Sequence, residues 1–172
     1  NAMVYRLNED YESILCLYFA LIQGVKSVRA AVLSPTGRIL HQQVRRFEPL
    51  DATAIEQESA AAFRLFPSIS QVIVGTPSIA ENGVIRHSDI PELENVPQKT
   101  MLETKFPGPV FLANDMHYKV YGYYRQEQIS DKIVTLVNYP SGVLPGTATV
   151  HKGTLLTGRN LFAGMVGLLD YG

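Results

Sequence analysis

The sequence has almost none of the residues that cross-link small proteins or bind metals in clusters. Cys16 is the only cysteine among 172 residues, which excludes an internal disulfide and any multi-cysteine zinc site. Tryptophan is absent, and the cysteine usage suits a reducing cytoplasm. A chain of this length removes roughly 70% of its unfolded surface from water, so we expect folding without metal or disulfide staples.

The chain also lacks an excess of either charge and a long apolar run. Fifteen Lys and Arg balance sixteen Asp and Glu, so the chain as given has no basic field for nucleic acid. Its longest apolar run, residues 14–22, is far shorter than the roughly 20 residues that span a bilayer. Acidic residues precede the run, unlike a secretory signal. We therefore expect no membrane partner and interpret residues 14–22 as a buried strand.

The first part of the chain predicts a three-stranded antiparallel meander followed by a helix. The expected strands cover residues 14–22, 27–34 and 38–47, with a Ser-Pro-Thr-Gly turn before the third. Asp51 is a helix cap for residues 52–66, and Pro67 prevents continuation. The alanine-rich face of this helix is expected to lie on the sheet.

The middle of the chain alternates short strands, turns and helices. A β-branched run at residues 71–74 enters Gly75-Thr76-Pro77-Ser78, which we expect to be a tight, exposed loop. Asn82-Gly83 favours a hairpin turn, and residues 97–106 are predicted to be helical. Another strand is expected over residues 110–113.

The last part of the chain predicts one more helix and a strand pair. Asn114-Asp115 is expected to cap a helix that continues to about Gln128, with Met116, Val120 and one of Tyr123 or Tyr124 facing inward. Four tyrosines crowd this helix; we favour two packed inward and two on the surface over a partner-binding cluster. Residues 131–139 and 147–152 are predicted to form a hairpin.

This order of elements predicts an α/β fold with a mixed sheet, which is that of a ribonuclease-H-like lobe. We expect this lobe over residues 4–128 and the beginning of a second, incomplete lobe over residues 129–172. Residues 1–3 are typical of a cleaved purification tag. Either the chain is a piece of a longer protein, or its second lobe is reduced.

Several motifs in one order resemble the ROK family of sugar kinases and repressors, whose fold is of the actin and hexokinase type. They are Val74-Gly75-Thr76-Pro77-Ser78, Asn82-Gly83-Val84-Ile85, Asp89-Ile90-Pro91, residues 109–115 (Pro-Val-Phe-Leu-Ala-Asn-Asp) and residues 153–164. Residues 4–8 are similar to the segment that joins a winged DNA-binding domain to the sugar-binding part of ROK repressors. The resemblance covers nearly the whole chain and favours a repressor fragment over a kinase.

Both phosphate loops of the family kinases are altered in this chain. The resemblance implies a D-x-G-G-T loop after the first strand, whose acid holds magnesium, but residues 22–26 read Ile-Gln-Gly-Val-Lys. The second loop, G-T-G-x-G-G in kinases, corresponds to residues 139–146, where two prolines lack N–H donors. Met165 and Leu168 replace a sugar-binding glutamate and a histidine that serves the sugar and zinc sites. We therefore expect no nucleotide cofactor and no metal.

The resemblance assigns sugar-pocket roles to five residues of this chain. Asn114 would bind the sugar, and Asp115 would be the base that deprotonates its hydroxyl if the protein were active. Asp89 stands where the family has a sugar-contacting Asn, and Gly75 and Ser78 belong to the loop that faces the same cleft. The structural alternatives are an ordinary helix cap with a first-turn acid, and ordinary loop residues. The four histidines have no metal-ligand spacing.

These observations predict a non-catalytic ROK-like domain that senses a sugar-like effector or oligomerises within a cytoplasmic transcriptional regulator. Such a protein would contact DNA only through a separate domain that precedes this chain, and we expect a homodimer. Two alternatives remain: an ATP-dependent sugar kinase with divergent loops, and a pure dimerisation module.

Overall fold

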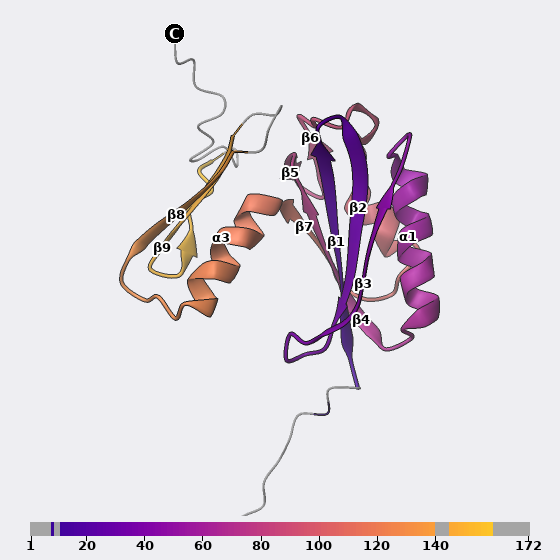
Figure 1. Cartoon of the computed structure of the whole chain (residues 1–172), viewed down its shortest axis with the longest axis horizontal. Coiled ribbons are helices and arrows are strands. Elements are labelled where there is room, and N and C mark those ends of the chain that lie inside the picture. The colour runs from indigo at the N-terminus through magenta and orange to yellow at the C-terminus, as the bar shows by residue number, and fades with distance from the viewer. Residues whose placement is uncertain (1–7, 9–10, 140–144, 160–172) are drawn as a thin grey trace, which may run out of the picture.

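The computed structural model describes residues 8, 11–139 and 145–159. Five strands form a mixed sheet in the order β3-β2-β1-β4-β7, and Figure 1 shows helix α1 along one of its faces. Three further strands form a second sheet in the order β10-β9-β8, beside helix α3. The predicted α/β fold with a mixed sheet is confirmed.

The first three strands are the predicted antiparallel meander. They are β1 (Ser13–Ile22), β2 (Val25–Leu33) and β3 (Ile39–Arg46). Between β1 and β2 only Gln23 and Gly24 are unpaired, and both have positive φ, at 51° and 77°. Two such residues make the hairpin turn that matches the twist of its strands. The connection that the resemblance aligns with a phosphate loop is therefore a minimal hairpin turn.

Two parallel strands extend the sheet on the other side of β1. Strand β4 (Ile69–Thr76) lies beside β1, and β7 (Val110–Asn114) lies beside β4. Strand β4 is longer than the predicted run of residues 71–74 because it continues through Gly75 and Thr76. The prediction of an exposed loop over residues 75–78 is wrong, because Gly75, Thr76 and Ser78 are buried. Gly75 and Thr76 belong to β4, and segments that follow later in the chain cover this end of the strand.

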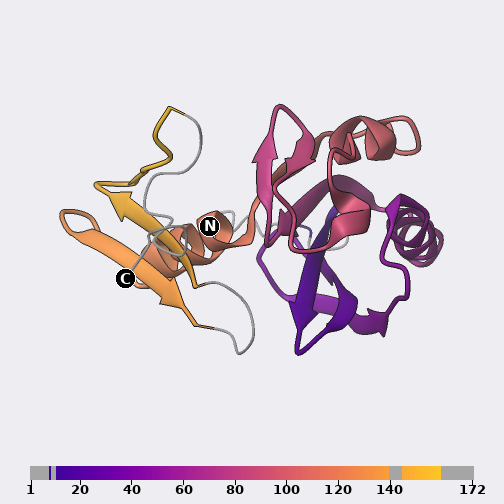
Figure 2. The same cartoon turned by 90° about the horizontal axis from the view of Figure 1, so that it is seen from above.

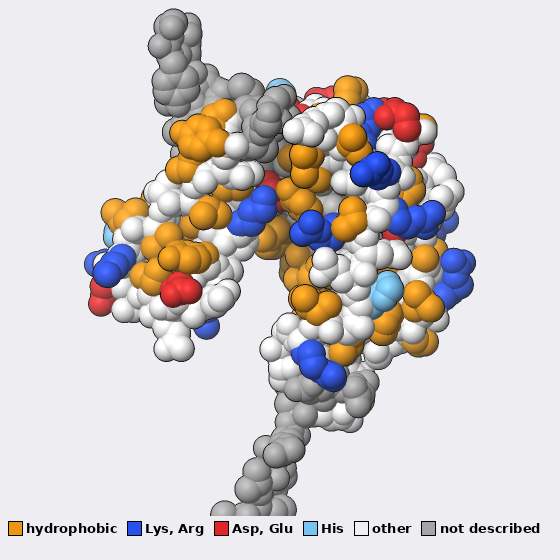
Figure 3. All heavy atoms as spheres, in the orientation of Figure 1, with side chains coloured by type: hydrophobic (Ala, Val, Ile, Leu, Met, Phe, Trp, Pro, Cys, Tyr) orange, Lys and Arg blue, Asp and Glu red, His pale blue; other side chains and the backbone are white. Residues whose placement is uncertain are grey.

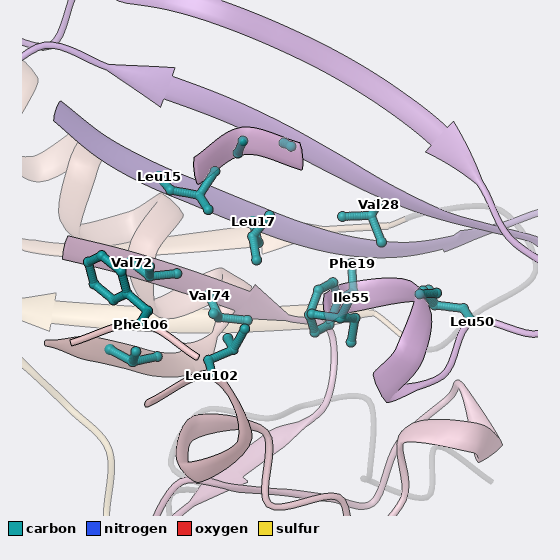
Figure 4. Packing of buried hydrophobic residues seen from close by; sticks show 14 of the residues in the cluster. Leu15, Leu17, Phe19, Val28, Leu50, Ile55, Val72, Val74, Leu102 and Phe106 are labelled. Carbon is teal, nitrogen blue, oxygen red and sulfur yellow. The ribbon is translucent and has the colours of Figure 1, made fainter. Parts of the chain in front are cut away.

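Helix α1 (Ala52–Leu65) covers one face of this sheet and closes the main hydrophobic core. Asp51 caps it as predicted, because its carboxylate accepts a hydrogen bond of 2.9 Å from the Ala54 amide. Figure 4 shows alternate residues of β1 and β4 pointing toward Ile55 of the helix. Each large apolar side chain buried here stabilises the fold by roughly 1.5–3 kcal/mol.

A fully buried carboxylate lies between α1 and the sheet. The Glu58 side chain is 0% exposed and accepts hydrogen bonds from Arg45 at 2.5 Å and from Gln43 at 2.8 Å. Both donors come from β3, so this cluster attaches an edge strand to the helix. Glu58 interrupts the alanine-rich face, and its burial is stable because two donors satisfy it.

The connection from β4 to β7 forms a small subdomain at the sheet end. Strands β5 (Ile79–Glu81) and β6 (Val84–Arg86) make the hairpin predicted from Asn82-Gly83, both with positive φ. The one-turn helix η1 (Pro91–Leu93) and helix α2 (Gln98–Glu103) follow. Helix α2 is shorter than the predicted 97–106.

Helix α3 (Asp115–Gln126) connects the large sheet to the small one. It carries the buried residues Met116, Val120 and Tyr124, which share a second hydrophobic cluster with Ala148 and Val150. Figure 2 shows this helix between the two sheets. The small sheet consists of β8 (Ile133–Asn138), β9 (Gly146–His151) and β10 (Thr154–Leu155). The predicted hairpin is confirmed, and the helix ends two residues before the predicted Gln128.

The tyrosines of α3 divide between the core and the surface. Tyr124 is 3% exposed, and its hydroxyl donates a 2.6 Å hydrogen bond to the Ser130 carbonyl oxygen. Tyr118 is half-buried, whereas Tyr121 and Tyr123 are exposed. The favoured two-and-two division is therefore confirmed. In the described ranges, none of the helices has the length and apolar character of a membrane span.

Replacing Arg45 with methionine should destabilise the fold strongly, because it leaves the buried Glu58 carboxylate without its cation. We expect Arg45→Met to lower the free energy of unfolding by about 2–4 kcal/mol in urea titrations. The neighbouring exposed Arg46 is the matched control, and Arg46→Met should change it by less than about 0.5 kcal/mol. Equal losses in the two variants would contradict the role given to Glu58.

Candidate functional site

The candidate site lies at the carboxyl ends of the parallel strands β4 and β7. Their register pairs Gly75 with Ala113 and Thr76 with Asn114, so the two motifs meet at one sheet edge. Ligands of open α/β sheets bind at this edge. The strand order therefore brings together four of the five predicted residues: Gly75, Ser78, Asn114 and Asp115.

Asn114 joins the two motifs through its side chain. Its Oδ1 accepts a hydrogen bond of 2.9 Å from the Met116 amide, which caps α3. Its Nδ2 donates a hydrogen bond of 3.0 Å to the Ser78 carbonyl oxygen, 36 residues away. The Asn114 residue is 9% exposed, so both bonds form away from bulk water. The predicted helix cap is confirmed, and the same side chain fixes the loop after β4.

Ser78 is part of a short chain of hydroxyl groups. Its side chain lies 2.7 Å from the Ser88 hydroxyl, and Ser88 accepts a 3.1 Å hydrogen bond from the Ile90 amide. Ser78 itself is 1% exposed. Asp89 follows Ser88 directly, and its side chain is exposed, unlike the other four predicted site residues. The loop from Ser88 to Ile90 is thereby attached to the end of β4.

Asp115, the residue in the position of the family's base, forms an ion pair. Its Oδ2 accepts a hydrogen bond of 2.5 Å from Lys119 Nζ, one helical turn later. The Asp115 side chain is 8% exposed and that of Lys119 is 38% exposed. This partner was not anticipated, although the four-residue spacing of opposite charges within a helix could have indicated it. The ammonium stabilises the carboxylate and occupies one of its oxygens.

Lys119 also reaches β1. Its Nζ lies 5.0 Å from the centre of the Tyr18 ring and 3.5 Å from the Tyr18 hydroxyl. Burial lowers the pKa of Lys119, but its hydrogen bond to Asp115 and the nearby negative charge more than offset this and raise it overall. Lys119 therefore stays charged and links α3 to the first strand.

Two further ionisable side chains near the site, Tyr118 and Cys16, are neutral near pH 7. Burial raises the pKa of Tyr118 to about 12 and also raises the pKa of the Cys16 thiol. A β-carbon placed on Gly75 would lie 3.6 Å from Asp115 Cβ and 3.7 Å from Tyr118 Cδ2, which is ordinary contact distance. Cys16 is therefore a packed side chain and not a thiolate nucleophile.

The β1–β2 turn, which the resemblance aligns with the first phosphate loop, lacks the groups that such a loop uses to hold magnesium and phosphate. The turn of Gln23 and Gly24 has no carboxylate for a metal, and two residues cannot wrap a phosphate. Lys26, two residues after this turn, is engaged by Glu92 at 2.5 Å and by Glu48 at 3.1 Å. The hydrogen bond to Glu92, and after it the one to Glu48, raises the pKa of Lys26. The same bond from Lys26 lowers the pKa of Glu92.

Parts of the expected pocket lie outside the described residues. These parts are residues 140–144 of the second phosphate loop and residues 160–168, with Met165 and Leu168. Residues 1–3, which the sequence analysis interprets as a tag remnant, and residues 4–7 lie outside as well. Within the described ranges, no three or more His, Cys, Asp or Glu side chains gather as a metal site.

Solved structures similar to this chain are ROK sugar kinases and a ROK regulator. The ROK family glucokinase from Streptomyces griseus, in complex with glucose and AMPPNP, has a TM-score of 0.76 at 20% identity over 93% of this chain and 51% of its own. The ROK hexokinase from Thermus thermophilus gives 0.73 at 22% identity over 93% and 54%. A ROK family transcriptional regulator, a homologue of the E. coli MLC protein, gives 0.74 at 14% identity over 92% and 41%.

These likenesses confirm the expected ROK fold. The chain spans about half the length of the structures that it matches, so it contains one lobe and part of a second. No protein-family model matches the chain, and no curated protein sequence does. The kinase and regulator structures match the fold equally well.

His117, next to the Asp115–Lys119 pair, makes the stability of the site depend on pH. Burial lowers its pKa below the usual 6.5, and the Asp115 charge offsets this only in part. His117 therefore binds a proton more tightly in the unfolded chain than in the folded chain. The free energy of unfolding is highest above pH 6.5 and decreases as the pH falls through the pKa of folded His117.

We expect His117→Gln to make the free energy of unfolding less sensitive to acid in this window, measured by urea titration at several pH values. His151→Gln, at an exposed position of β9, is the matched control and should leave the dependence unchanged. A direct NMR titration of His117 should give a pKa below 6.5. A pKa above that value would contradict the buried environment.

Proposed function

We propose that this chain is a non-catalytic ROK-family domain of a transcriptional regulator, which binds a small hydroxylated ligand at the sheet edge around Asn114 and Asp115. DNA would be bound by a separate domain. A ROK regulator shares this fold, with a TM-score of 0.74 over 92% of the chain, and the preference for a regulator over a kinase rests on the altered phosphate loop described next. The residues at this sheet edge support a ligand, because carboxylate, amide and ammonium groups together match sugar hydroxyls.

The observation that carries this proposal is the hairpin turn at Gln23 and Gly24. Phosphoryl transfer depends on backbone N–H groups, a metal and cations arranged around the transferred phosphate. Here β1 and β2 remain paired up to Ile22 and Val25, so the connection between these two strands has no loop to surround an anion. The ammonium of Lys26, two residues after the turn, is already bound by two carboxylates. The geometry favours binding without phosphoryl transfer.

The ion pair at the base position supports the same conclusion. A general base must reach the hydroxyl proton of its substrate, and its efficiency depends on a free carboxylate. Asp115 Oδ2 instead accepts a hydrogen bond from Lys119 at 2.5 Å. The second oxygen can still accept a hydrogen bond from a ligand hydroxyl. Asp115 is thus suited to recognise a hydroxyl group rather than to deprotonate it.

The mechanism we propose for such a sensor is a population shift. Helix α3 carries Asp115 and Lys119 and also the buried residues under the small sheet. A ligand that contacts α3 and β4 together would favour one relative position of the two sheets. Ligand binding would change DNA affinity only if the DNA-binding domain also binds differently to the two relative positions of the sheets.

A kinase with divergent loops is the second candidate. The observation that favours it is the Asn114-Asp115 pair at the end of β7 in a fold shared with a glucokinase that binds glucose and AMPPNP. A domain that only dimerises is the third candidate and predicts no ligand at all.

We expect no hexokinase-like activity from this chain. Magnesium-ATP calorimetry should give no saturable heat, and a coupled ADP assay with glucose or mannose should not exceed the protein-free rate. The reason is the missing phosphate cradle at Gln23 and Gly24. Saturable turnover that disappears in Asp115→Asn would establish the kinase alternative and refute the proposal.

Any neutral sugar that binds should do so weakly and at the sheet edge. In calorimetry with glucose and mannose, we expect dissociation constants in the range of about 1 mM or weaker, because few directional partners are available. Asp115→Ala and Asn114→Ser should each weaken binding about tenfold or more, and Asn114→Ser retains a hydroxyl that can cap α3.

The control for these variants is Asp131→Ala, since Asp131 is exposed and lies before β8. It should bind the sugar as the unchanged protein does. A sugar whose affinity is the same in both site variants binds elsewhere, which would overturn the site. Absence of binding across sugars and sugar acids would favour the dimerisation module.

A further inference from the structure

The resemblance to the ROK family assigns no role to Lys119, although its ammonium lies against the Asp115 carboxylate. Lys119 Nζ is 2.5 Å from Asp115 Oδ2, and the Lys119 side chain remains 38% exposed. A charged group that is paired and still reaches solvent can contact a ligand together with its partner. What this pair offers to a ligand depends on the hydrogen-bonding groups that the pairing leaves unused.

The Asp115 carboxylate has one oxygen left for a ligand. Oδ2 accepts the hydrogen bond from Lys119, whereas Oδ1 has no hydrogen-bond partner among the described residues. In the same part of the chain, Oδ1 is also not one of the unpartnered polar atoms that are hidden from solvent. The Asp115 side chain is 8% exposed, so the part of it that reaches solvent is small. Oδ1 can therefore accept a hydrogen bond from a hydroxyl group.

The Lys119 ammonium has a donor left for the same ligand. An ammonium group carries three N–H donors, which point apart in tetrahedral directions. One of them donates to Asp115 Oδ2, and the Tyr18 hydroxyl, 3.5 Å from Nζ, lies near a second. At least one donor therefore remains, and it points away from the Asp115 carboxylate because the three N–H directions diverge.

Contacts on two sides hold this ammonium in place. Besides its ion pair within α3, Nζ lies 5.0 Å from the centre of the Tyr18 ring on β1. The ion pair and the cation–π contact restrict a lysine side chain that would otherwise lose rotamer freedom on binding a ligand. Figure 3 shows a hollow beside α3, between the parts that contain the two sheets, with basic and acidic side chains around it. The donor is thus already positioned before a ligand binds.

We infer that Lys119 is a second ligand-binding residue, and that Lys119 and Asp115 together recognise two adjacent hydroxyl groups of an uncharged ligand, a vicinal diol. One hydroxyl donates a hydrogen bond to Asp115 Oδ1, and its neighbour accepts one from Lys119 Nζ. A single hydroxyl does not serve both groups well, because the free N–H points away from the carboxylate that would accept its proton. A ligand carboxylate would instead compete with Asp115 for the ammonium.

This inference rests on the proposed function and predicts which analogues of one sugar lose affinity. In NMR titrations of the whole chain with glucose and its monodeoxy analogues, two analogues should bind about tenfold or more weakly than glucose. The hydroxyls that these two analogues lack should be neighbours on the ring, because removing either one leaves a polar group of the protein unpaired. A single affected analogue, or two whose missing hydroxyls are not adjacent, would contradict recognition of a diol.

Lys119→Met tests the new residue in a double-mutant cycle with the same analogues. The variant should bind glucose about tenfold more weakly, and one of the two losses caused by a missing hydroxyl should disappear, because that hydroxyl no longer has a partner. The other loss, which depends on Asp115, should remain. A merely structural Lys119 would weaken glucose and every analogue by the same factor, which would overturn the inference. Lys119→Gln keeps a neutral donor beside Asp115 and gives the same comparison if Lys119→Met folds poorly: the first loss should shrink and the second should not.

Lys99→Met is the matched control, because Lys99 also pairs with an acid four residues away, Glu103, and has a similar exposure of 43%. It should leave every affinity unchanged. A sugar that is lost in Asp115→Ala but keeps both analogue losses in Lys119→Met would overturn this inference and leave the proposed function standing. Absence of binding by glucose and mannose would refute the ligand of the proposed function, and this inference with it.

Discussion

The geometry of the candidate site depends on the two hydrogen bonds of the Asn114 side chain. One bond begins α3 by capping the Met116 amide, and the other fixes the Ser78 carbonyl after β4. Because a buried amide that lost either partner would pay a desolvation cost of about 1–3 kcal/mol, the two bonds specify one arrangement. The direction of α3 and the position of Asp115 at its first turn follow from this arrangement.

Helix α3 transmits the same constraint to the small sheet. Its buried residues pack on β8 and β9, and a β-carbon on Gly146 would come within 3.0 Å of Met116 Cγ. Glycine at the start of β9 therefore allows the strand to approach the first turn of the helix closely. Lys119 adds a contact from α3 to Tyr18 of β1. One helix thus connects the ligand site, the large sheet and the small sheet.

Local patterns were sufficient to predict most elements, because apolar periodicity, helix caps and hairpin turns act over a few residues. Asp51, Asn82-Gly83 and Asn114 are signals of this kind, and each has the predicted role. Residues 75–78 were predicted to be exposed because glycine and proline usually mark surface loops. They are buried by loops that return later in the chain, including Ser88, and a pattern of neighbouring residues carries no information about that return.

The electrostatic partners were harder to predict for the same reason. Glu58 and Arg45 are 13 residues apart, and Lys26 and Glu92 are 66 residues apart, so only the register of the strands and loops brings them together. The Asp115–Lys119 pair was local and could have been found from its spacing. The motif alone indicates a base at Asp115 in an active protein, whereas the spacing within α3 indicates that Lys119 neutralises this carboxylate.

The shortened β1–β2 turn and the Asp115–Lys119 pair reinforce each other. In a site that holds magnesium and phosphate, the charges near the base change with each bound group. In this chain β1 turns directly into β2, so this turn provides no bound magnesium or phosphate near Asp115. The buried Asp115 carboxylate is neutralised by the Lys119 ammonium instead. Lys119 therefore balances the charge of Asp115 from within the same helix. The charge balance of Asp115 is thus internal to α3 and needs no bound metal ion to neutralise the carboxylate.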